Sequence, residues 1–161
     1  DVLIRAGVKV KLVSITGKKE VKGAHGFGIH ADTLLHEIDP MKADLLFLPG
    51  GMPGTVNLGK SEAVTKAAVY CAENVKITAA ICAAPSVLGN LGILKGKKAT
   101  CFPGFEKELE EATYTAAPVE IDGNVITGKG AGCAILFGKA IVEKAVSAEA
   151  ANKVCGDMQC P

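Results

Sequence analysis

Two short apolar segments constrain the fold of this chain more than any other feature of its sequence. Residues 45–48 are entirely apolar, and residues 77–81 contain one hydroxyl side chain among apolar ones. Segments of this length and composition are typical of β-strands that are covered on both faces. Each is followed by a loop and a helical segment, residues 61–74 and residues 83–91. The order of strand, helix, strand and helix predicts an α/β domain with a mostly parallel sheet and helices on both faces.

The remaining segments extend this pattern. Residues 2–6 are typical of the end of a helix that Gly7 terminates, so we expect the start of that helix to precede Asp1. An Asp-Gly turn at residues 122–123 predicts a small antiparallel hairpin. The other expected elements are a strand over 8–15, two strand pieces within 20–30, a helical or irregular stretch over 32–38, a strand over 98–102, a helix over 106–112, hairpin strands within 119–127, and helices over 133–146 and 147–158.

Composition places these elements in a single domain and excludes several classes of protein. The chain has 161 residues, of which 48% are hydrophobic, enough to form a substantial core. Its 18 basic and 17 acidic residues give a net charge of +1, and Trp is absent, so we expect no nucleic-acid partner. No apolar run approaches the length of a membrane helix, and no signal peptide is recognisable. We therefore expect a cytoplasmic protein without a membrane partner.

The six cysteines are scattered along the chain. They form no C-x-x-C motif and have no histidine at metal-ligand spacing, so we expect no metal site. A domain of this size does not need disulfides, and we expect most of the thiols to be small core residues in a reducing compartment. Cys155 and Cys160 remain candidates for redox chemistry because they lie near the exposed C-terminus. The other four are Cys71, Cys82, Cys101 and Cys133.

Three of the expected strands end in unusual loops. These loops are Pro-Gly-Gly at residues 49–51, Cys-Ala-Ala at residues 82–84 and Gly-Lys-Gly at residues 128–130. In open parallel sheets, ligands bind beyond the carboxyl ends of the strands. If the three strands are neighbours, the loops form one rim, and Cys82 is its only strong nucleophile.

The residues around Cys82 resemble a nucleophile elbow, a sharp turn from a strand into a helix. Such a turn needs small residues two positions before and after the nucleophile, and Ala80 and Ala84 occupy those positions. The N-terminus of the following helix favours the thiolate, which is the reactive form. The N–H of Ala83 is a candidate for one half of an oxyanion hole, and the Gly50–Gly51 pair for the other.

Less specific interpretations remain open at each of these positions. A cysteine at the end of an apolar strand is often only a small buried residue, and a Gly-Gly pair is often a simple turn. The loop over residues 128–132 lacks both the Walker and the dinucleotide-binding order of residues, which argues against a nucleotide. His25, His30 and His36 are the only histidines, and each is more typical of a polar surface than of a catalytic base.

Two of these motifs together resemble a known family. Residues 79–85, Ala-Ala-Ile-Cys-Ala-Ala-Pro, and residues 48–51, Leu-Pro-Gly-Gly, resemble the ThiJ/PfpI superfamily, and the chain is similar throughout to its DJ-one branch. That branch includes the parkinsonism-associated deglycase and its bacterial relatives. The resemblance implies a flavodoxin-like three-layer sandwich and a homodimer without a cofactor. It also implies a reactive Cys82, with an oxyanion site at the N–H groups of Gly51 and Ala83.

The activities implied by this resemblance leave three functions open. The first is a cofactor-free glyoxalase or deglycase, in which the Cys82 thiolate attacks small α-oxoaldehydes or their protein and nucleotide adducts. The second is an oxidative-stress thiol sensor or chaperone, because an accessible thiolate is the first to be oxidised. The third is an intracellular cysteine peptidase or amidase, which requires a base near Cys82.

The chain departs from the family pattern in ways that affect the expected site. The family's acidic partner of the cysteine and its first strand precede the helix at residues 1–6, so we expect them on a segment or chain outside these 161 residues. Phe102 stands where many relatives carry a histidine, and Lys129 stands where close relatives carry an arginine. Arg5 and His25 are weaker candidates for the pocket, which we expect to include Gly50 and Gly130 as well.

Overall fold

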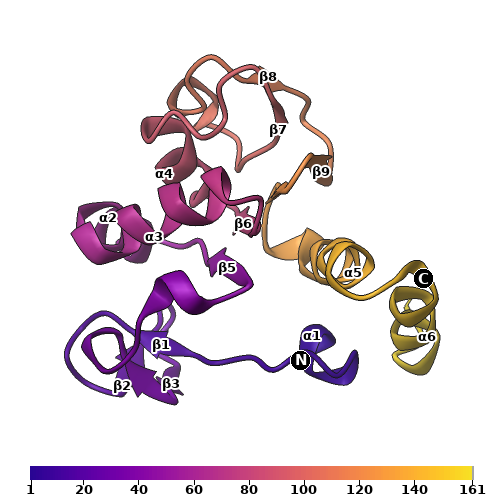
Figure 1. The fold of residues 1–161 in the computed structure, drawn as a ribbon, viewed down its shortest axis with the longest axis horizontal. Coiled ribbons are helices and arrows are strands. Elements are labelled where there is room, and N and C mark those ends of the chain that lie inside the picture. Colours follow the sequence, from indigo (N-terminus) through magenta and orange to yellow (C-terminus); the bar gives the residue numbers. More distant parts are fainter. Residues whose placement is uncertain (161) are drawn as a thin grey trace.

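A four-stranded sheet lies at the centre of the computed structural model, which describes residues 1–160 (Figure 1). Its strand order is β5–β6–β10–β9. The strands β5, β6 and β10 are mutually parallel, and β9 pairs antiparallel with β10. This arrangement confirms the mostly parallel sheet with an added hairpin. The bounds of the strands are Leu45–Leu48 for β5, Ile77–Ile81 for β6, Val119–Asp122 for β9 and Val125–Gly128 for β10.

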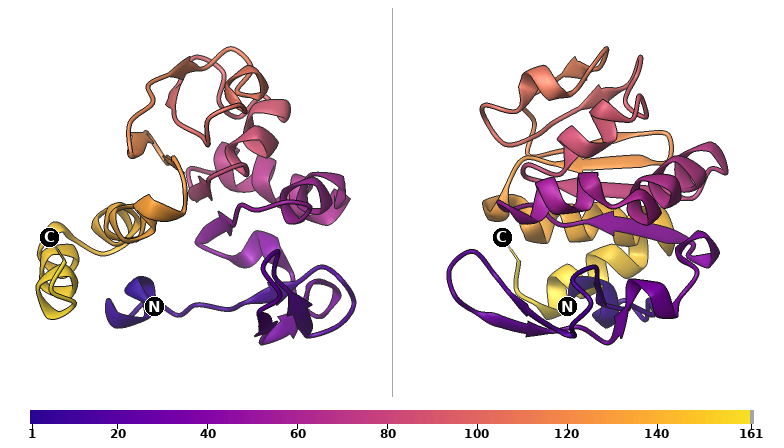
Figure 2. Two further views of the ribbon diagram at one scale, coloured as in Figure 1. Left: turned by 180° about the vertical axis from the view of Figure 1, so that it is seen from behind. Right: turned by 90° about the vertical axis from the view of Figure 1, so that its left-hand side faces the viewer.

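Helices cover both faces of this sheet, which gives the flavodoxin-like sandwich (Figures 1 and 2). On one face, α3 and α4 pack against β6, and α2 packs against both of these helices. On the other face, α5 packs along β6, β9 and β10, and it also contacts α1 and α6. The helices are α1 (Val2–Arg5), α2 (Gly54–Lys60), α3 (Glu62–Glu73), α4 (Pro85–Asn90), α5 (Ala134–Ala145) and α6 (Ala148–Asp157).

Two apolar cores result, one on each face of β6. Successive side chains of a strand point to opposite faces, so Ala80 joins the core beneath α3 and α4, whereas Ala79 and Ile81 join the core beneath α5. Leu88 of α4 is fully buried in the first core and Phe137 of α5 is buried in the second. The small side chains of β6 let both helix layers approach the strand closely.

A second, smaller sheet lies beyond the β5 edge of the main sheet (Figures 1 and 2). It contains only β1 and β4, which are parallel, so the expected strand over residues 8–15 was too long. Within residues 1–160, β5 pairs only with β6, and Phe47 of β5 is 41% exposed. The expected cover on both faces is therefore incomplete at Phe47, although its ring packs against Phe137 of α5. The nearby elements are β1 (Val13–Ser14), β2 (Glu20–Lys22), β3 (Gly28–His30), β4 (Thr33–Leu34) and the 3-10 turns Leu35–Glu37 and Pro40–Lys42.

The helical predictions need three corrections. Helix α2 was not expected, because a Pro-Gly pair at residues 53–54 is typical of a loop. The expected helix over 106–112 is only a 3-10 turn, since Glu111 has a left-handed φ of 56° that ends helical geometry. The helix after Cys82 is six residues long and begins at Pro85. The remaining elements are β7 (Lys98–Ala99), β8 (Thr113–Tyr114) and the 3-10 turns Glu106–Glu108 and Ala131–Cys133.

The cysteines are less buried than the sequence predicted. Only Cys71 and Cys101 are buried, and the other four thiols are half-buried. The expectation that most thiols are core residues was therefore wrong, because the strand end, loop and helix positions of those four leave each side chain partly open to solvent. No helix within residues 1–160 has the length and apolar character needed to cross a membrane.

Candidate functional site

The three unusual loops meet at one edge of the sheet. Strands β5 and β10 flank β6, with Leu48 opposite Ala80 and Gly128 opposite Ile81. Because all three strands run in the same direction, the loops that follow them lie side by side at their carboxyl ends. We call this edge the rim, defined by residues 49–54, 82–84 and 128–133. Its formation confirms the expected neighbourhood of the loops.

Cys82 occupies a strained turn in the middle of the rim. Its φ is +65°, in the left-handed region that a residue with a β-carbon rarely adopts. Two backbone hydrogen bonds hold it there: its N–H donates to the carbonyl of Gly128 at 2.8 Å, and its carbonyl accepts from the N–H of Phe102 at 2.8 Å. The side chain is half-buried. The chain thus bends sharply at the sulfur, as expected for an elbow.

Gly50 packs directly against this turn. A β-carbon at Gly50 would lie 2.5 Å from Cβ of Cys82 and 2.6 Å from the carbonyl oxygen of Ile81, so no other residue fits without a backbone shift. The next residue, Gly51, has a φ of +90°. Its carbonyl accepts hydrogen bonds from the N–H of Thr55 at 2.9 Å and from the Thr55 hydroxyl at 3.0 Å. The first turn of α2 therefore fixes the loop that faces Cys82.

The backbone N–H groups of Gly51 and Ala83, on two loops of the rim, are both free. Among residues 1–160, neither the N–H of Gly51 nor the N–H of Ala83 donates to a protein acceptor. The orientation of the elbow is set by Ser86, a buried residue whose hydroxyl donates to the carbonyl of Ala83 at 2.6 Å. Free N–H groups on a fixed turn are the type of donor that stabilises an oxyanion. Ser86 and Thr55 were not singled out from the sequence, since nothing in their local pattern distinguishes them from ordinary helix residues.

A second thiol lies close to Cys82. Burial, together with the nearby charges of Glu106 and Cys82, raises the pKa of Cys101 to about 11. The Glu106 carboxylate accepts both of its hydrogen bonds from the N–H of Gly104, which lowers the pKa of Glu106. Cys101 is fully buried and keeps its proton at neutral pH. The two neighbouring cysteines therefore differ in exposure, and only Cys82 is accessible to a ligand.

The other expected pocket residues divide into two groups. Phe102 and Gly130 lie at the rim, where a β-carbon at Gly130 would be 3.5 Å from the Phe102 ring. Lys129 also belongs to the rim, but its ammonium group donates to the carbonyl of Ala116 at 3.2 Å. Arg5 is an exposed residue of α1 that pairs with the Asp1 carboxylate at 2.7 Å.

His25 lies in the exposed turn between β2 and β3, apart from the end of β6 (Figures 1 and 2). No hydrogen bond within residues 1–160 links Arg5 or His25 to the rim.

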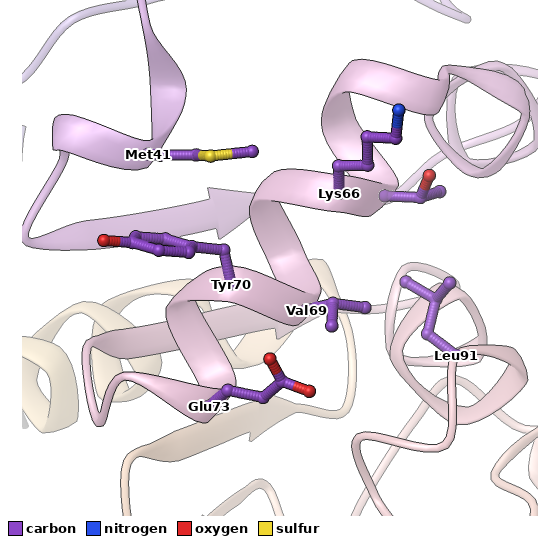
Figure 3. A pocket seen from close by; sticks show the side chains of 7 residues that line it. Met41, Lys66, Val69, Tyr70, Glu73 and Leu91 are labelled. Carbon is purple, nitrogen blue, oxygen red and sulfur yellow. The ribbon is translucent and has the colours of Figure 1, made fainter.

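Two hollows of the surface lie on the side of the sheet that α2, α3 and α4 cover. One hollow has a volume of about 340 Å³. It is bordered by Met41, by Leu91 and by side chains of α3, among them Tyr70 (Figure 3). Another, of about 370 Å³, is lined by Thr55 and Ser86, the two residues that fix the rim loops. Cys82 lines neither hollow. Within residues 1–160, no cluster of three or more His, Cys, Asp or Glu side chains is arranged to hold a metal ion.

Comparison with known proteins agrees with this geometry. The sequence model of the DJ-1/PfpI family matches residues 1–144. The chain belongs to the DJ-1/PfpI family. It is similar to Protein DJ-1 homolog B of Arabidopsis thaliana, at 38% identity over 160 residues, which are 98% of this chain and 36% of that protein. The chain therefore spans well under half the length of this relative.

Two further proteins are similar to this chain, one in structure and one in sequence. The crystal structure of Drosophila melanogaster DJ-1beta matches with a TM-score of 0.94 and 34% identity, covering 100% of this chain and 88% of that chain. Deglycase PH1704 of Pyrococcus horikoshii is 33% identical over 112 residues, which are 68% of this chain and 66% of that protein. The expected family and fold are thereby confirmed.

Proposed function

We propose that Cys82 is the nucleophile of a cofactor-free glyoxalase or deglycase that acts on small α-oxoaldehydes or on their adducts with proteins and nucleotides. The observation that carries the proposal is the position of Cys82. It is half-buried on a left-handed turn, beside two backbone N–H groups that have no acceptor within residues 1–160. The similarity to a protein named as a deglycase supports the same class of reaction.

The first step is addition of the Cys82 sulfur, as thiolate, to the aldehyde carbon. A C–S bond forms, and the π electrons of the carbonyl move to its oxygen. The N–H groups of Gly51 and Ala83 donate to that oxyanion, which is stabilised because both donors are fixed before the substrate arrives. Protonation of the oxygen gives a hemithioacetal.

The later steps need a group that carries a proton. In the glyoxalase reaction, the hydrogen on the former aldehyde carbon moves as a proton to the neighbouring carbonyl carbon, which leaves a thioester on Cys82. Water then releases the 2-hydroxy acid and restores the thiol. No carboxylate within residues 1–160 is hydrogen-bonded to the Cys82 sulfur. We propose that the proton carrier is a carboxylate on a segment outside these residues.

The split sheet supports a place for that segment. Strand β5 ends the main sheet and β1 belongs to the small sheet beyond it, and neither strand has a second partner within residues 1–160. A strand added at these edges would satisfy their free backbone groups and cover Phe47. Hydrogen exchange tests this proposal. The amides of β5 should exchange more slowly in a longer protein that includes the segment than in residues 1–161 alone.

The decisive assay is lactate production from methylglyoxal by the full-length protein. Cys82→Ala should reduce the rate to the level of buffer, because the bond-forming sulfur is lost. Cys155→Ala is a matched control, since Cys155 is also half-buried but lies on α6, and it should retain the full rate. Equal rates for Cys82→Ala and the unaltered protein would overturn the proposal.

Oxidant sensing is the second candidate, and the contrast between Cys82 and Cys101 favours it over amide cleavage. An accessible sulfur next to a buried one predicts selective oxidation of Cys82 by peroxide. If mass spectrometry shows Cys82 oxidised no faster than Cys71 or Cys133, this candidate fails. Amide cleavage lacks its base among residues 1–160, because no histidine there is hydrogen-bonded to Cys82 and all three are exposed.

A further inference from the structure

The end of α6 brings two cysteines together. Gln159 has a left-handed φ of +53°, which turns the chain back over the last turn of the helix. The N–H of Cys160 then donates to the carbonyl of Cys155 at 2.9 Å, and the N–H of Gln159 donates to the carbonyl of Gly156 at 3.0 Å. These two bonds define a Schellman motif, in which the residue after the left-handed position returns to the residue three from the helix end.

In Schellman motifs, the two side chains that meet in this way are frequently apolar. Here both are thiols, and both are half-buried and free. The backbone hydrogen bond from Cys160 to Cys155 brings the two side chains to the same end of the helix. Burial raises the pKa of Cys160, and the contact and charge of Cys155 raise it further, while the Lys139 ammonium group on α5 lowers it. The backbone turn has thus assembled a dithiol that the Cys82 site does not use.

We propose that Cys155 and Cys160 form a reversible dithiol–disulfide pair that is oxidised by peroxides or by small disulfides. A peroxide oxidises one sulfur to a sulfenic acid and is itself reduced to water or an alcohol. The second thiol attacks that sulfur, the S–S bond forms and a second water leaves. With a small disulfide, exchange transfers the oxidation instead, and two molecules of the small thiol are released.

The backbone explains why this pair closes readily. Disulfides require the two Cα atoms to lie close together, and a turn already held by two backbone hydrogen bonds meets that need with little further ordering. The site is separate from the rim, since α6 packs on the outer side of α5 (Figure 1).

Peptide mapping tests the proposal directly. Trypsin cleavage after Lys153 yields a peptide that begins at Val154 and contains both Cys155 and Cys160. The full-length protein, carrying Cys82→Ser to remove the rim thiol, is treated with hydrogen peroxide or oxidised glutathione and then alkylated. We expect this peptide to lose two hydrogens and to take up no alkylating reagent, and dithiothreitol should reverse both changes. Independent oxidation of each sulfur, or disulfides only between chains, would overturn the proposal.

Variants of Gln159 test whether the turn positions the pair. Gln159→Gly keeps the left-handed conformation, so the disulfide should form at least as fast as in the parent. Gln159→Val disfavours that conformation, because its side chain is branched at Cβ, and should slow closure about tenfold. Circular dichroism verifies that both variants are folded. Equal rates in the three proteins would show that the turn does not position the thiols, and would also overturn the proposal.

Discussion

The elbow at Cys82 and the end of α6 both depend on a residue that is not glycine in a left-handed conformation. At the elbow, the φ of +65° belongs to the cysteine itself, and neighbouring loops surround it on both sides. At the end of α6, the φ of +53° belongs to Gln159, which is exposed and is held by two hydrogen bonds within its own turn.

The two regions differ in how firmly the surrounding structure holds the left-handed residue. Strained backbone persists where the surrounding structure determines it, as Gly50 and the Gly128 carbonyl do for Cys82. The end of a surface helix opens at much lower cost, because few contacts hold it. The first position therefore suits the proposed nucleophile, whose sulfur must stay fixed, and the second suits the proposed pair of thiols, which must move together and apart.

The largest loss of stability is expected from Gly50→Ala, which changes the packing of the elbow. The added methyl group would lie 2.5 Å from Cβ of Cys82, so the rim loop or the elbow must shift. We expect the free energy of unfolding to fall by about 3 kcal/mol in urea titrations. Gly54→Ala is the control, since it lies in the same rim with nothing within 4 Å of its β-carbon, and should change stability by less than about 0.5 kcal/mol. Equal stability of the two variants would contradict close packing at the elbow.

Ser86→Ala should have the next largest effect. It removes the buried hydroxyl that donates to the Ala83 carbonyl at 2.6 Å, and we expect a loss of about 1–2 kcal/mol in the free energy of unfolding. Lactate production should fall as well, because the Ala83 N–H belongs to the peptide group next to that carbonyl. Ser61→Ala is the control, since the Ser61 side chain makes no capping bond to α3. If Ser86→Ala lowers the free energy of unfolding less than Ser61→Ala does, Ser86 does not position the elbow.

Glycine substitutions measure the strain at the two left-handed residues directly. Cys82→Gly should be more stable than Cys82→Ala by about 1 kcal/mol, because glycine adopts this φ without a steric cost. The free energy of unfolding of Gln159→Gly should exceed that of Gln159→Ala by no more than about 1 kcal/mol, since the end of α6 relaxes more easily. Both differences are measured by thermal and urea unfolding. If Cys82→Gly is no more stable than Cys82→Ala, the elbow stores no strain, and the proposed contrast between the elbow and the end of α6 is wrong.

Alkaline pH provides a further test, because it acts beside the elbow through Cys101. The folded Cys101 thiol has a pKa of about 11, above its usual 9.0. Between these values the native state keeps a proton that the unfolded chain releases, so stability present below pH 9 is lost as the pH rises through 11. Cys101→Ala should make the free energy of unfolding fall less steeply over this range. An unchanged slope would mean that Cys101 is not protected by the fold.

The sequence predicted the main sheet and the rim well because both follow from local patterns. The short apolar segments at 45–48 and 77–81 and the small residues beside Cys82 specify strands and a sharp turn without reference to distant residues. The α2 helix was missed because its first turn is stabilised through the Gly51 carbonyl, which propensity does not reveal.

The parts of the site that sequence could not predict depend on contacts between distant segments. The hydrogen bond from Phe102 to Cys82 and the proximity of Cys101 arise only when the end of β7 packs against the elbow. Arg5 and His25 were included as weaker pocket candidates through family resemblance, and neither is hydrogen-bonded to the rim within residues 1–160. The contact between Cys155 and Cys160 depends on a left-handed Gln159, a residue type that gives little sign of that conformation.

The alternation of Ala79 and Ala80 along β6 has a consequence for how the sulfur is aligned. Since the strand carries side chains into both cores, a bulkier residue at either position would push β6 away from the helices on that face. Cys82 follows this strand directly and would move with it. The position of the Cys82 sulfur relative to the N–H groups of Gly51 and Ala83 therefore depends on apolar contacts on both faces of the sheet, so we expect substitutions in either core to alter the proposed activity.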